Sequence, residues 1–289
     1  MSKNISYDLH LLQRRNRDGS IATQSNRNRI LQQMGKQLHE LGFRNMQAKS
    51  LKEKHVDALV KKWQADGLSA GTMKNRMSTL RWWAEKIGKR NIVARDNSHY
   101  GIDDRQYVSQ ESKAQKLENE TLGKIKDPYL KMSLELQREF GLRREESMKF
   151  QPSYADQGDF IRLKASWTKG GRERVVPITS ESQRTALDKA HKIAGRGSLI
   201  PPNKKYIQQL RLYEKHTSEV GLSKLHGLRH EYAQRRYCEL TGWKAPVAGG
   251  PSSKQLTAEQ KQLDRSVRLQ ISEELGHSRE QITTVYLGR

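Results

Sequence analysis

The stretch KLHGLRHEYAQRRY (224–237) places His226, Arg229 and His230 within five residues. Residues three or four apart on a helix share a face, so two imidazoles and a guanidinium are expected to project together. Such a set could bind a metal ion, hold an anion, or form an ordinary solvated face.

A metal site is the weakest of these interpretations. The zinc-protease pattern has a glutamate directly after its first histidine, whereas Gly227 stands there in this chain. Arg229 lies between the two imidazoles and would repel a cation. The only other plausible ligands nearby are His216 and His277, and zinc sites want three or four ligands. We therefore predict no metal site.

An anion site suits Arg229 and His226 better. A guanidinium offers a rigid fork of donors that fits phosphate oxygens. His230 is expected to be buried, hydrogen-bonded and important mainly for the fold.

Two further cations could complete an anion site. GLRREESMKF (141–150) supplies Arg143, which Glu146 could hold by a salt bridge, although the spacing alone favours an ordinary surface pair. Lys169 stands in the KGGR turn, where a lysine is usually solvated but can also reach into a cleft. Because lysine can lose its proton, Lys169 could act as a general acid.

The segment ELGHSREQITTVYLGR (274–289) adds His277 and, nine residues later, Tyr286. A tyrosine in such a segment usually packs or stays exposed. A phenol that acts as a nucleophile is rarer, but it is one of the groups that form covalent intermediates.

The composition indicates a polyanionic partner. Lys and Arg number 54 against 32 Asp and Glu, and this net charge of +22 favours nucleic acid over a generally basic surface. We find no signal peptide and no run of about 18 apolar residues. The single cysteine, Cys238, excludes a disulfide within one chain, so a reducing, cytoplasmic compartment is expected.

The elements that must position these residues are mostly helical. Three N-terminal segments carry apolar stripes at helical spacing. The stripe residues are Ile30, Met34, Leu38 and Leu41; Val56, Leu59, Val60 and Trp63; and Met73, Met77, Leu80 and Trp83. The opposite face of the third segment carries Lys74, Arg76 and Arg81. The one β signal is DFIRLKASWTKGGRERVVPIT (159–179), which predicts a hairpin around the KGGR turn.

We therefore predict a mainly α chain with two domains. A helical domain over 1–97 is joined by a linker over 98–112 to a mostly helical domain with a small antiparallel sheet over 113–289. GWKAPVAGGPSSKQ (242–255) is expected to be an exposed loop.

Taken in order, the motifs GLRREE, TKGGRERVVPI, HGLRH, LGHS and VYLG resemble those of the tyrosine recombinase (phage-type integrase) family. The family pattern is an arginine in a G-L-R-x-x-E context, a lysine in a hairpin turn, H-x-x-R opening a helix, and L-G-H followed by a tyrosine. The resemblance covers 113–289, and the basic helices before it are more loosely similar to the family's core-binding domain. The spacing to Glu146 selects Arg143 rather than the adjoining Arg144.

The resemblance implies a role for each matching residue. Arg143 and Arg229 would grip the scissile phosphate. Tyr286 would attack phosphorus and form a 3′-phosphotyrosyl link. Lys169 would protonate the leaving 5′ oxygen.

The remaining motif residues would assist this step. His226 would hydrogen-bond the phosphate and help to move the tyrosine proton, and His277 would brace the pentacoordinate transition state. Glu146 would orient Arg143. Neither metal nor ATP is implied, because the protein–DNA ester keeps the energy of the broken bond.

The resemblance further implies a site-specific DNA recombinase that integrates or excises a mobile element. Its partners would be double-stranded DNA, gripped between the two domains, three further copies in a homotetramer on two duplexes, and accessory DNA-bending or directionality proteins. It would work in the bacterial cytoplasm, at the nucleoid. Lys74, Arg76 and Arg81 would contact phosphates or bases.

The alternatives are a strand-relaxing enzyme like type IB topoisomerases and a non-catalytic DNA-binding regulator. Residues 242–262 lengthen the spacing between the histidine motifs and are expected to be a surface insertion.

Overall fold

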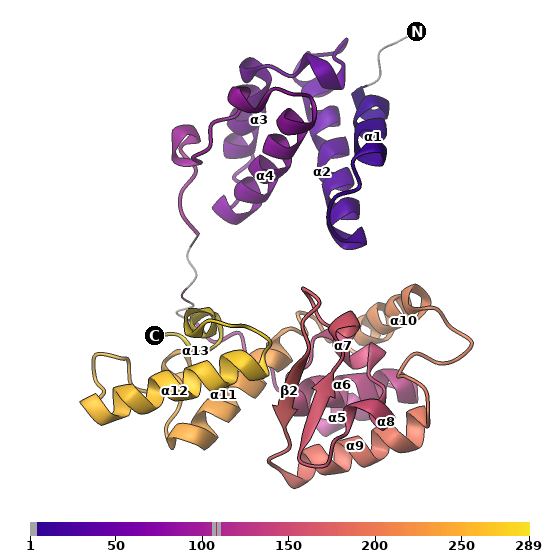
Figure 1. Ribbon diagram of the computed structural model, residues 1–289, viewed down its shortest axis with the longest axis vertical. Coiled ribbons are helices and arrows are strands. Elements are labelled where there is room, and N and C mark those ends of the chain that lie inside the picture. Colours follow the sequence, from indigo (N-terminus) through magenta and orange to yellow (C-terminus); the bar gives the residue numbers. More distant parts are fainter. Residues whose placement is uncertain (1–4, 106–107, 109–110) are drawn as a thin grey trace. The chain divides into compact units, whose positions relative to one another are not determined.

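The computed structural model describes residues 5–105, 108 and 111–289. The chain divides into two compact units, Met1–Gln106 and Tyr107–Arg289 (Figure 1). Helices dominate both units, and the described residues form one two-stranded sheet, so the expected mainly α fold is confirmed. The domain bounds 1–97 and 113–289 stay predictions. Residues 106–107 and 109–110 of the expected linker lie outside the described residues.

The first unit is built from helices around one apolar core. Its elements are α1 (Ile5–Arg15), α2 (Ile21–Glu40), η1 (Ala48–Ser50), α3 (Glu53–Ala65), α4 (Ala70–Lys86), η2 (Arg90–Ile92) and η3 (Ser98–Tyr100). The hydroxyls of Ser20 and Ser69 accept backbone N–H groups and thereby fix the starts of α2 and α4. The three predicted stripes form the core, except that Leu41 caps α2 and is 39% exposed.

The start of the expected linker belongs to the first unit. Ile102 is buried in its core and Tyr100 packs against it. The hydroxyl of Tyr100 accepts from Ala94 N at 2.9 Å. The low periodicity of this segment therefore reflects a compact turn that packs through two apolar side chains.

The second unit surrounds the sheet with helices. Its helical elements are α5 (Asn119–Gly123), α6 (Pro128–Phe140), α7 (Arg144–Lys149), α8 (Pro152–Ala155), η4 (Ala165–Trp167), α9 (Glu181–Ala194), α10 (Tyr206–Glu219), α11 (Gly227–Thr241), η5 (Pro246–Ala248), α12 (Ala258–Glu274), η6 (Glu280–Thr283) and α13 (Thr284–Leu287). A main apolar core lies between the sheet, α6, α9, α11 and α12, and a smaller core includes residues of α5, α6 and α10.

The two strands, β1 (Phe160–Leu163) and β2 (Arg174–Pro177), pair antiparallel. The connection between them is longer than the tight hairpin that the sequence predicted. Trp167 is buried in the main core, so the chain leaves the sheet and forms η4 before the KGGR turn. The turn therefore extends beyond the paired strands.

The expected exposed loop over 242–255 is partly buried, which corrects the prediction. Ala245 is fully buried, and Val247 and Ala248 pack against the main core. Apolar side chains at these positions cover the C-terminal helix α13, which contacts η5.

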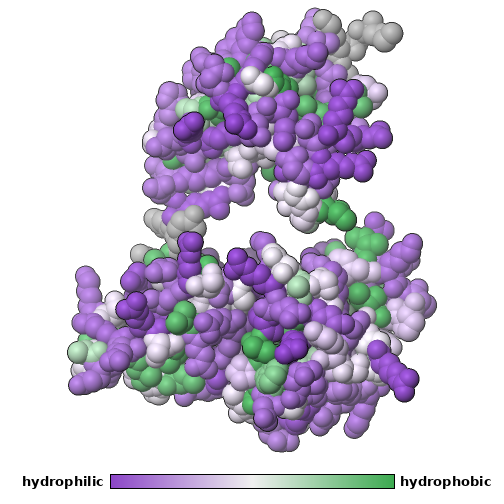
Figure 2. Space-filling view, in the orientation of Figure 1, coloured by the Kyte–Doolittle hydropathy of each residue, from purple (hydrophilic) through white to green (hydrophobic). Residues whose placement is uncertain are grey.

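Most of the surface seen in Figure 2 is hydrophilic, in keeping with the charge of the chain. Within the described residues, no helix has the length and apolar character needed to cross a membrane.

Candidate active site

The turn between α6 and α7 brings Arg143 to the site. α6 ends at Gly141, whose left-handed φ of +59° closes the helix. A Cβ at this position would lie 2.5 Å from Tyr232 Cδ1, so the close approach also requires glycine. Arg143 then caps α7, and its Nη2 donates to Leu275 O at 3.3 Å.

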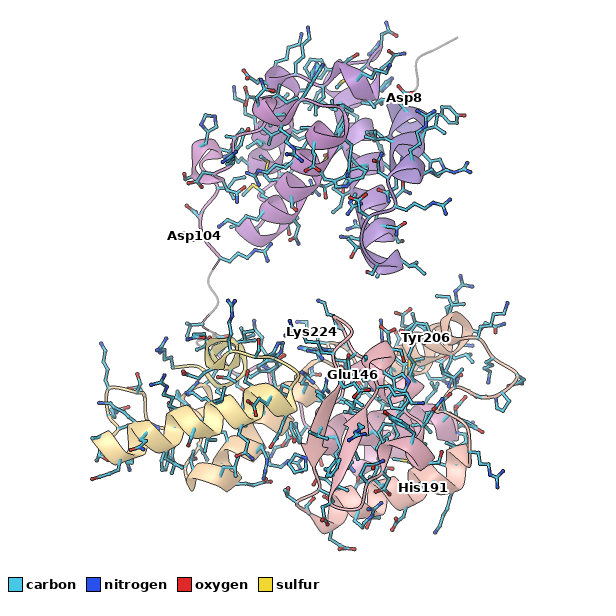
Figure 3. The ribbon with its side chains drawn as sticks, viewed as in Figure 1. Asp8, Asp104, Glu146, His191, Tyr206 and Lys224 are labelled. Atoms are coloured by element: carbon cyan, nitrogen blue, oxygen red, sulfur yellow. The ribbon has the colours of Figure 1, made fainter. Side chains whose placement is uncertain are left out.

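Glu146, labelled in Figure 3, is fully buried in the second unit. It binds two arginines. Arg174 Nη1 and Nη2 each donate to one carboxylate oxygen at 2.7 Å, and Arg143 donates through its backbone N–H and Nη1, also at 2.7 Å. Burial alone would raise the pKa of Glu146. The charges of Arg174, Arg229 and Arg143 outweigh burial and lower the pKa to about 2, so Glu146 stays ionised and fixes Arg143.

Replacing Glu146 with Gln is expected to destabilise the protein by about 3 kcal/mol at pH 7, the equivalent of its pKa shift. The variant leaves the buried charges of Arg174 and Arg229 without a counter-charge. The folded-state pKa of Glu146 lies below the unfolded value, so the stabilisation is complete above roughly pH 4.5 and is lost as the pH falls toward 2. Urea unfolding at several pH values measures the difference.

Glu145→Gln is the matched control for this experiment. Glu145 pairs with Lys149 at 2.6 Å, but its side chain is 52% exposed. Its loss should change stability by less than about 1 kcal/mol. A difference between Glu146→Gln and wild type that does not depend on pH would contradict the assigned charge state.

Arg229 lies in the first turn of α11 and is 1% exposed. Its Nη1 donates to Gly141 O at 2.5 Å, and its Nη2 donates to Leu275 O. Burial, followed by the nearby charge of Arg174, lowers the pKa of Arg229 to about 10, which leaves the side chain cationic at neutral pH. The guanidinium of Arg229, at the start of α11, thus binds the backbone carbonyls that end α6 and α12.

Tyr286 reaches the same guanidinium from α13. Its hydroxyl oxygen accepts from Arg229 Nε at 3.4 Å, and the guanidinium carbon lies 5.9 Å from the ring centroid. Gln234 Nε2 donates to the backbone carbonyl of Tyr286 at 3.0 Å. Because Tyr286 is only 6% exposed, its phenol is held against a cation rather than in solvent.

Three imidazoles surround the ring of Tyr286. The ring centroids of His230, His226 and His277 lie 4.7, 6.0 and 6.3 Å from the phenol ring centroid. Desolvation, followed by neighbouring positive groups, lowers the pKa of all three, to about 4 for His230 and His277. All three are therefore neutral at neutral pH and able to accept a proton. The Nε2 of His277 is buried and has no hydrogen-bond partner within the described part of the chain.

Lys169 lies apart from this cluster. It is exposed in the turn over 168–171 and makes no hydrogen bond or ion pair with another described residue. Its positive charge nevertheless contributes to the lowered pKa of His226. The expected site residues that the structure does bring together are Arg143, Glu146, His226, Arg229, His277 and Tyr286.

The arrangement combines cations, neutral imidazoles and a phenol. Guanidinium donors suit the oxygens of a phosphate, and a phenol beside them can serve as a nucleophile. Within residues 5–105, 108 and 111–289, no group of three or more His, Cys, Asp or Glu side chains could hold a metal ion.

Two family models match most of the chain. "Phage integrase, N-terminal" matches residues 1–93, and "Integrase" matches residues 101–235. The chain belongs to the tyrosine recombinase (phage-type integrase) family. The resemblance drawn from the motifs is confirmed, and so is the expected class of enzyme, a tyrosine-type site-specific recombinase. No curated protein matches the integrase by sequence.

Solved recombinases share the fold of the integrase. A lambda integrase dimer bound to a COC′ core site has a TM-score of 0.61 and 15% identity, over 97% of this chain and 76% of that chain. XerH site-specific recombinase bound to palindromic difH substrate has a TM-score of 0.59 and 16% identity, over 98% of this chain and 81% of that chain. The Tn1549 transposon integrase in complex with transposon right end DNA has a TM-score of 0.59 and 12% identity, over 99% of this chain and 95% of that chain.

The N-terminal residues expected to contact DNA have partners inside the integrase. Lys74 Nζ pairs with Asp104 at 2.5 Å. Arg76 is 9% exposed and stacks on a buried tryptophan, because α4 turns it toward α3 rather than outward. Arg81 donates to two acceptors in the turn over 94–97. Their contact with DNA stays a prediction.

Arg174 was not predicted at the site, and His230 was not predicted to lie beside Tyr286. Arg174, which binds Glu146, lies on the same face of β2 as the buried Val176. An arginine on the inward face of a strand signals a buried partner, and this signal was available in the sequence. His230, expected to act mainly in the fold, is buried and has the imidazole nearest to Tyr286.

Proposed function

We propose that the integrase cleaves DNA when the hydroxyl oxygen of Tyr286 attacks a backbone phosphorus atom. The bond from phosphorus to the 5′ oxygen breaks as the bond to tyrosine forms, which leaves a 3′-phosphotyrosyl link and a 5′-hydroxyl. The observation that carries this proposal is the contact of 3.4 Å between the Tyr286 hydroxyl and Arg229. A cation at that distance favours the phenolate and can bind the same phosphate.

Arg143 and Arg229 would hold the phosphate. Both donate to the same backbone carbonyl oxygen, so their guanidiniums lie close together. Preorganised cations stabilise the charge that develops on phosphorus. In this scheme Glu146 orients Arg143, His226 takes the tyrosine proton, and the unpaired Nε2 of His277 donates to a phosphate oxygen.

Lys169 is proposed to give its proton to the leaving 5′ oxygen. Lys169→Ala is expected to slow cleavage roughly 10²- to 10⁴-fold, the usual contribution of a general acid. A substrate with sulfur in place of the 5′-bridging oxygen should recover most of this loss, because a thiolate leaves without a proton. Single-turnover cleavage of both substrates makes the comparison.

Arg172→Ala is the control for Lys169→Ala, because Arg172 is exposed in the same connection between the strands. It should cleave both substrates at the wild-type rate. Equal losses by Lys169→Ala on the oxygen and sulfur substrates would reject Lys169 as the acid.

The N-terminal domain over 1–97 is proposed to grip DNA. Lys74 can exchange its partner for a phosphate easily, because Asp104 is fully exposed. Arg76 would have to leave the buried ring of Trp63 first, and Arg81 would have to give up two hydrogen bonds to the turn over 94–97.

Relatives support an assembled complex on DNA. Lambda integrase has been solved as a dimer on a core site and as a tetramer on a Holliday junction, and the Tn1549 transposon integrase with circular intermediate DNA. We infer that this chain acts as a homotetramer on two duplexes, in the integration or excision of a mobile element. Accessory DNA-bending or directionality proteins would be further partners, at the bacterial nucleoid. The reaction needs neither ATP nor a metal, because the ester stores the bond energy and arginines stabilise the transition state.

Trapping the protein on DNA tests the proposal. The integrase is incubated with a random-sequence duplex library and denatured in SDS, and the linked DNA and peptide are mapped. We expect Tyr286 joined to the 3′ side of a recurring sequence. Cleavage without sequence preference would favour a strand-relaxing enzyme, and DNA binding without any adduct would favour a regulator.

A further inference from the structure

The helix that carries Tyr286 cannot hold its own position. α13 spans four residues, Thr284–Leu287. A single helical turn is unstable by itself in water, so the geometry of α13 depends on contacts from surrounding elements. Such contacts come from α11, from η6 and from η5.

Arg268 on α12 holds the chain just beyond Tyr286. Its Nη1 donates to Gly288 O at 2.9 Å, and its Nε donates to both carboxylate oxygens of Asp264 at 2.8 and 2.9 Å. The side chain of Arg268 is only 3% exposed. A buried guanidinium is costly unless it is paired, and here Asp264 supplies the opposite charge while Nη1 reaches one backbone carbonyl.

Asp264 is oriented in turn by α11. Tyr237 OH donates to Asp264 Oδ1 at 2.5 Å, and Trp243 Nε1 donates to the hydroxyl of Tyr237 at 3.2 Å. Burial and the charge of Asp264 raise the pKa of Tyr237 to about 12, so its hydroxyl stays a donor. A continuous path of hydrogen bonds therefore runs from Trp243 to Gly288.

The segment over 245–248 closes the other side. Gly288 has a φ of +70°, and a Cβ there would lie 2.9 Å from Val247 N and 3.0 Å from Val247 Cβ. The loop folds tightly on itself, since a Cβ at Gly250 would overlap a backbone oxygen of the same loop. Gly288 is thus confined between Arg268 and Val247. Arg268 and Val247 contact Gly288, and Asp264 and Tyr237 orient Arg268. These four residues are here called the C-terminal clamp.

We propose that the C-terminal clamp positions the phenol of Tyr286 against Arg229. The proposal rests on the proposed function, in which Tyr286 is the nucleophile. In-line attack tolerates little misplacement, and a shift of about 1 Å can cost on the order of 100-fold in rate. The clamp also keeps α13 in its own unit while the tyrosine is bonded to DNA, so that the ester stays in place for religation. This gives the insertion over 242–262 a function in catalysis.

Hydrogen exchange on the 289-residue chain tests the contact between Arg268 and Gly288. Arg268→Ala removes the hydrogen bond from α12 to Gly288 O. Gly288→Ala introduces a Cβ that lies too close to Val247. Both should speed amide exchange over 284–288 about tenfold or more. Arg265→Ala is the control, because Arg265 is exposed on α12 and makes no hydrogen bond or ion pair with a described residue. Unchanged exchange in Arg268→Ala would overturn the clamp.

Cleavage tests the positioning role. The probe is a nicked duplex that carries the site found by adduct mapping. At saturating DNA, Arg268→Ala should form the Tyr286 adduct roughly 10- to 100-fold more slowly, the range for a lost hydrogen bond to a charged group. Its DNA affinity should match wild type. A general loss of folding would not lower the rate of adduct formation while leaving the DNA affinity unchanged. Arg268→Lys should recover part of the rate, because an ammonium can reach one of the two acceptors.

The sulfur-bridged substrate separates this effect from leaving-group chemistry. It should not rescue Arg268→Ala, because the nucleophile rather than the leaving group is misplaced. A wild-type rate in Arg268→Ala, with α13 exchanging freely, would overturn the positioning role alone. If wild type forms no adduct at Tyr286, the proposed function fails, and hydrogen exchange still decides whether the clamp exists.

Discussion

Tyr286→Phe is expected to abolish the SDS-resistant DNA adduct and to leave DNA binding intact. The change removes one oxygen atom, whose contact within the described residues is the 3.4 Å hydrogen bond from Arg229. Stability should therefore change by less than about 1 kcal/mol. The proposed reaction has no other nucleophile, so cleavage should fall by roughly 10⁴-fold or more. Adduct yield on the mapped site measures this loss, with DNA affinity measured in parallel.

Tyr154→Phe is a suitable control for the loss of a phenol oxygen. Tyr154 packs edge-on against Trp167 in the same unit and is not among the contacts of Arg229 in the described residues. Its variant should form the adduct at the wild-type rate. If Tyr286→Phe and wild type trap equal amounts of covalent product, another residue is the nucleophile.

Arg229→Ala is expected to slow adduct formation by roughly 10³-fold or more, the cost of removing a preorganised donor to the transition state. Arg229→Lys should recover only part of the rate. An ammonium keeps the charge but lacks the planar fork that binds two backbone carbonyls and faces the phenol. Single-turnover cleavage at saturating DNA gives the rates, and thermal unfolding reports any loss of folded protein.

Arg235→Ala controls for the loss of an arginine from α11. Arg235 is half-buried and pairs with Glu139 and Glu231, outside the site. It should reduce stability modestly and leave the rate of cleavage unchanged. A rate for Arg229→Ala close to that of Arg235→Ala would mean that Arg229 supports the fold and does not bind the phosphate.

The helices α2, α3 and α4 could be predicted because apolar residues recur along each of them at helical spacing. Leu41 departs from its stripe because it caps α2 after the helical turn has ended. The short helices α7 and α13 span six and four residues, which is too few for a periodic pattern to show.

The site could be predicted only in part, because its contacts join distant segments. The shared face of His226 and His230 was predicted from helical spacing, and their ring centroids lie 5.5 Å apart. Spacing could not distinguish a surface pair of Arg143 and Glu146 from the buried pair that forms. The deciding partner is Arg174, which reaches Glu146 from β2 across 28 residues of sequence.

The buried carboxylate of Glu146 sets the charge of the whole site. Three guanidiniums, from Arg143, Arg174 and Arg229, face this one carboxylate, which leaves a net charge of +2 (3 − 1). A phosphodiester brings one negative charge. In the proposed reaction the tyrosine oxygen brings a second when its proton departs. At pentacoordinate phosphorus two negative charges therefore face the +2 of the arginine–carboxylate group, while the transferred proton is held by His226. Mutual repulsion among the arginines is thus relieved in part by DNA and further by the transition state.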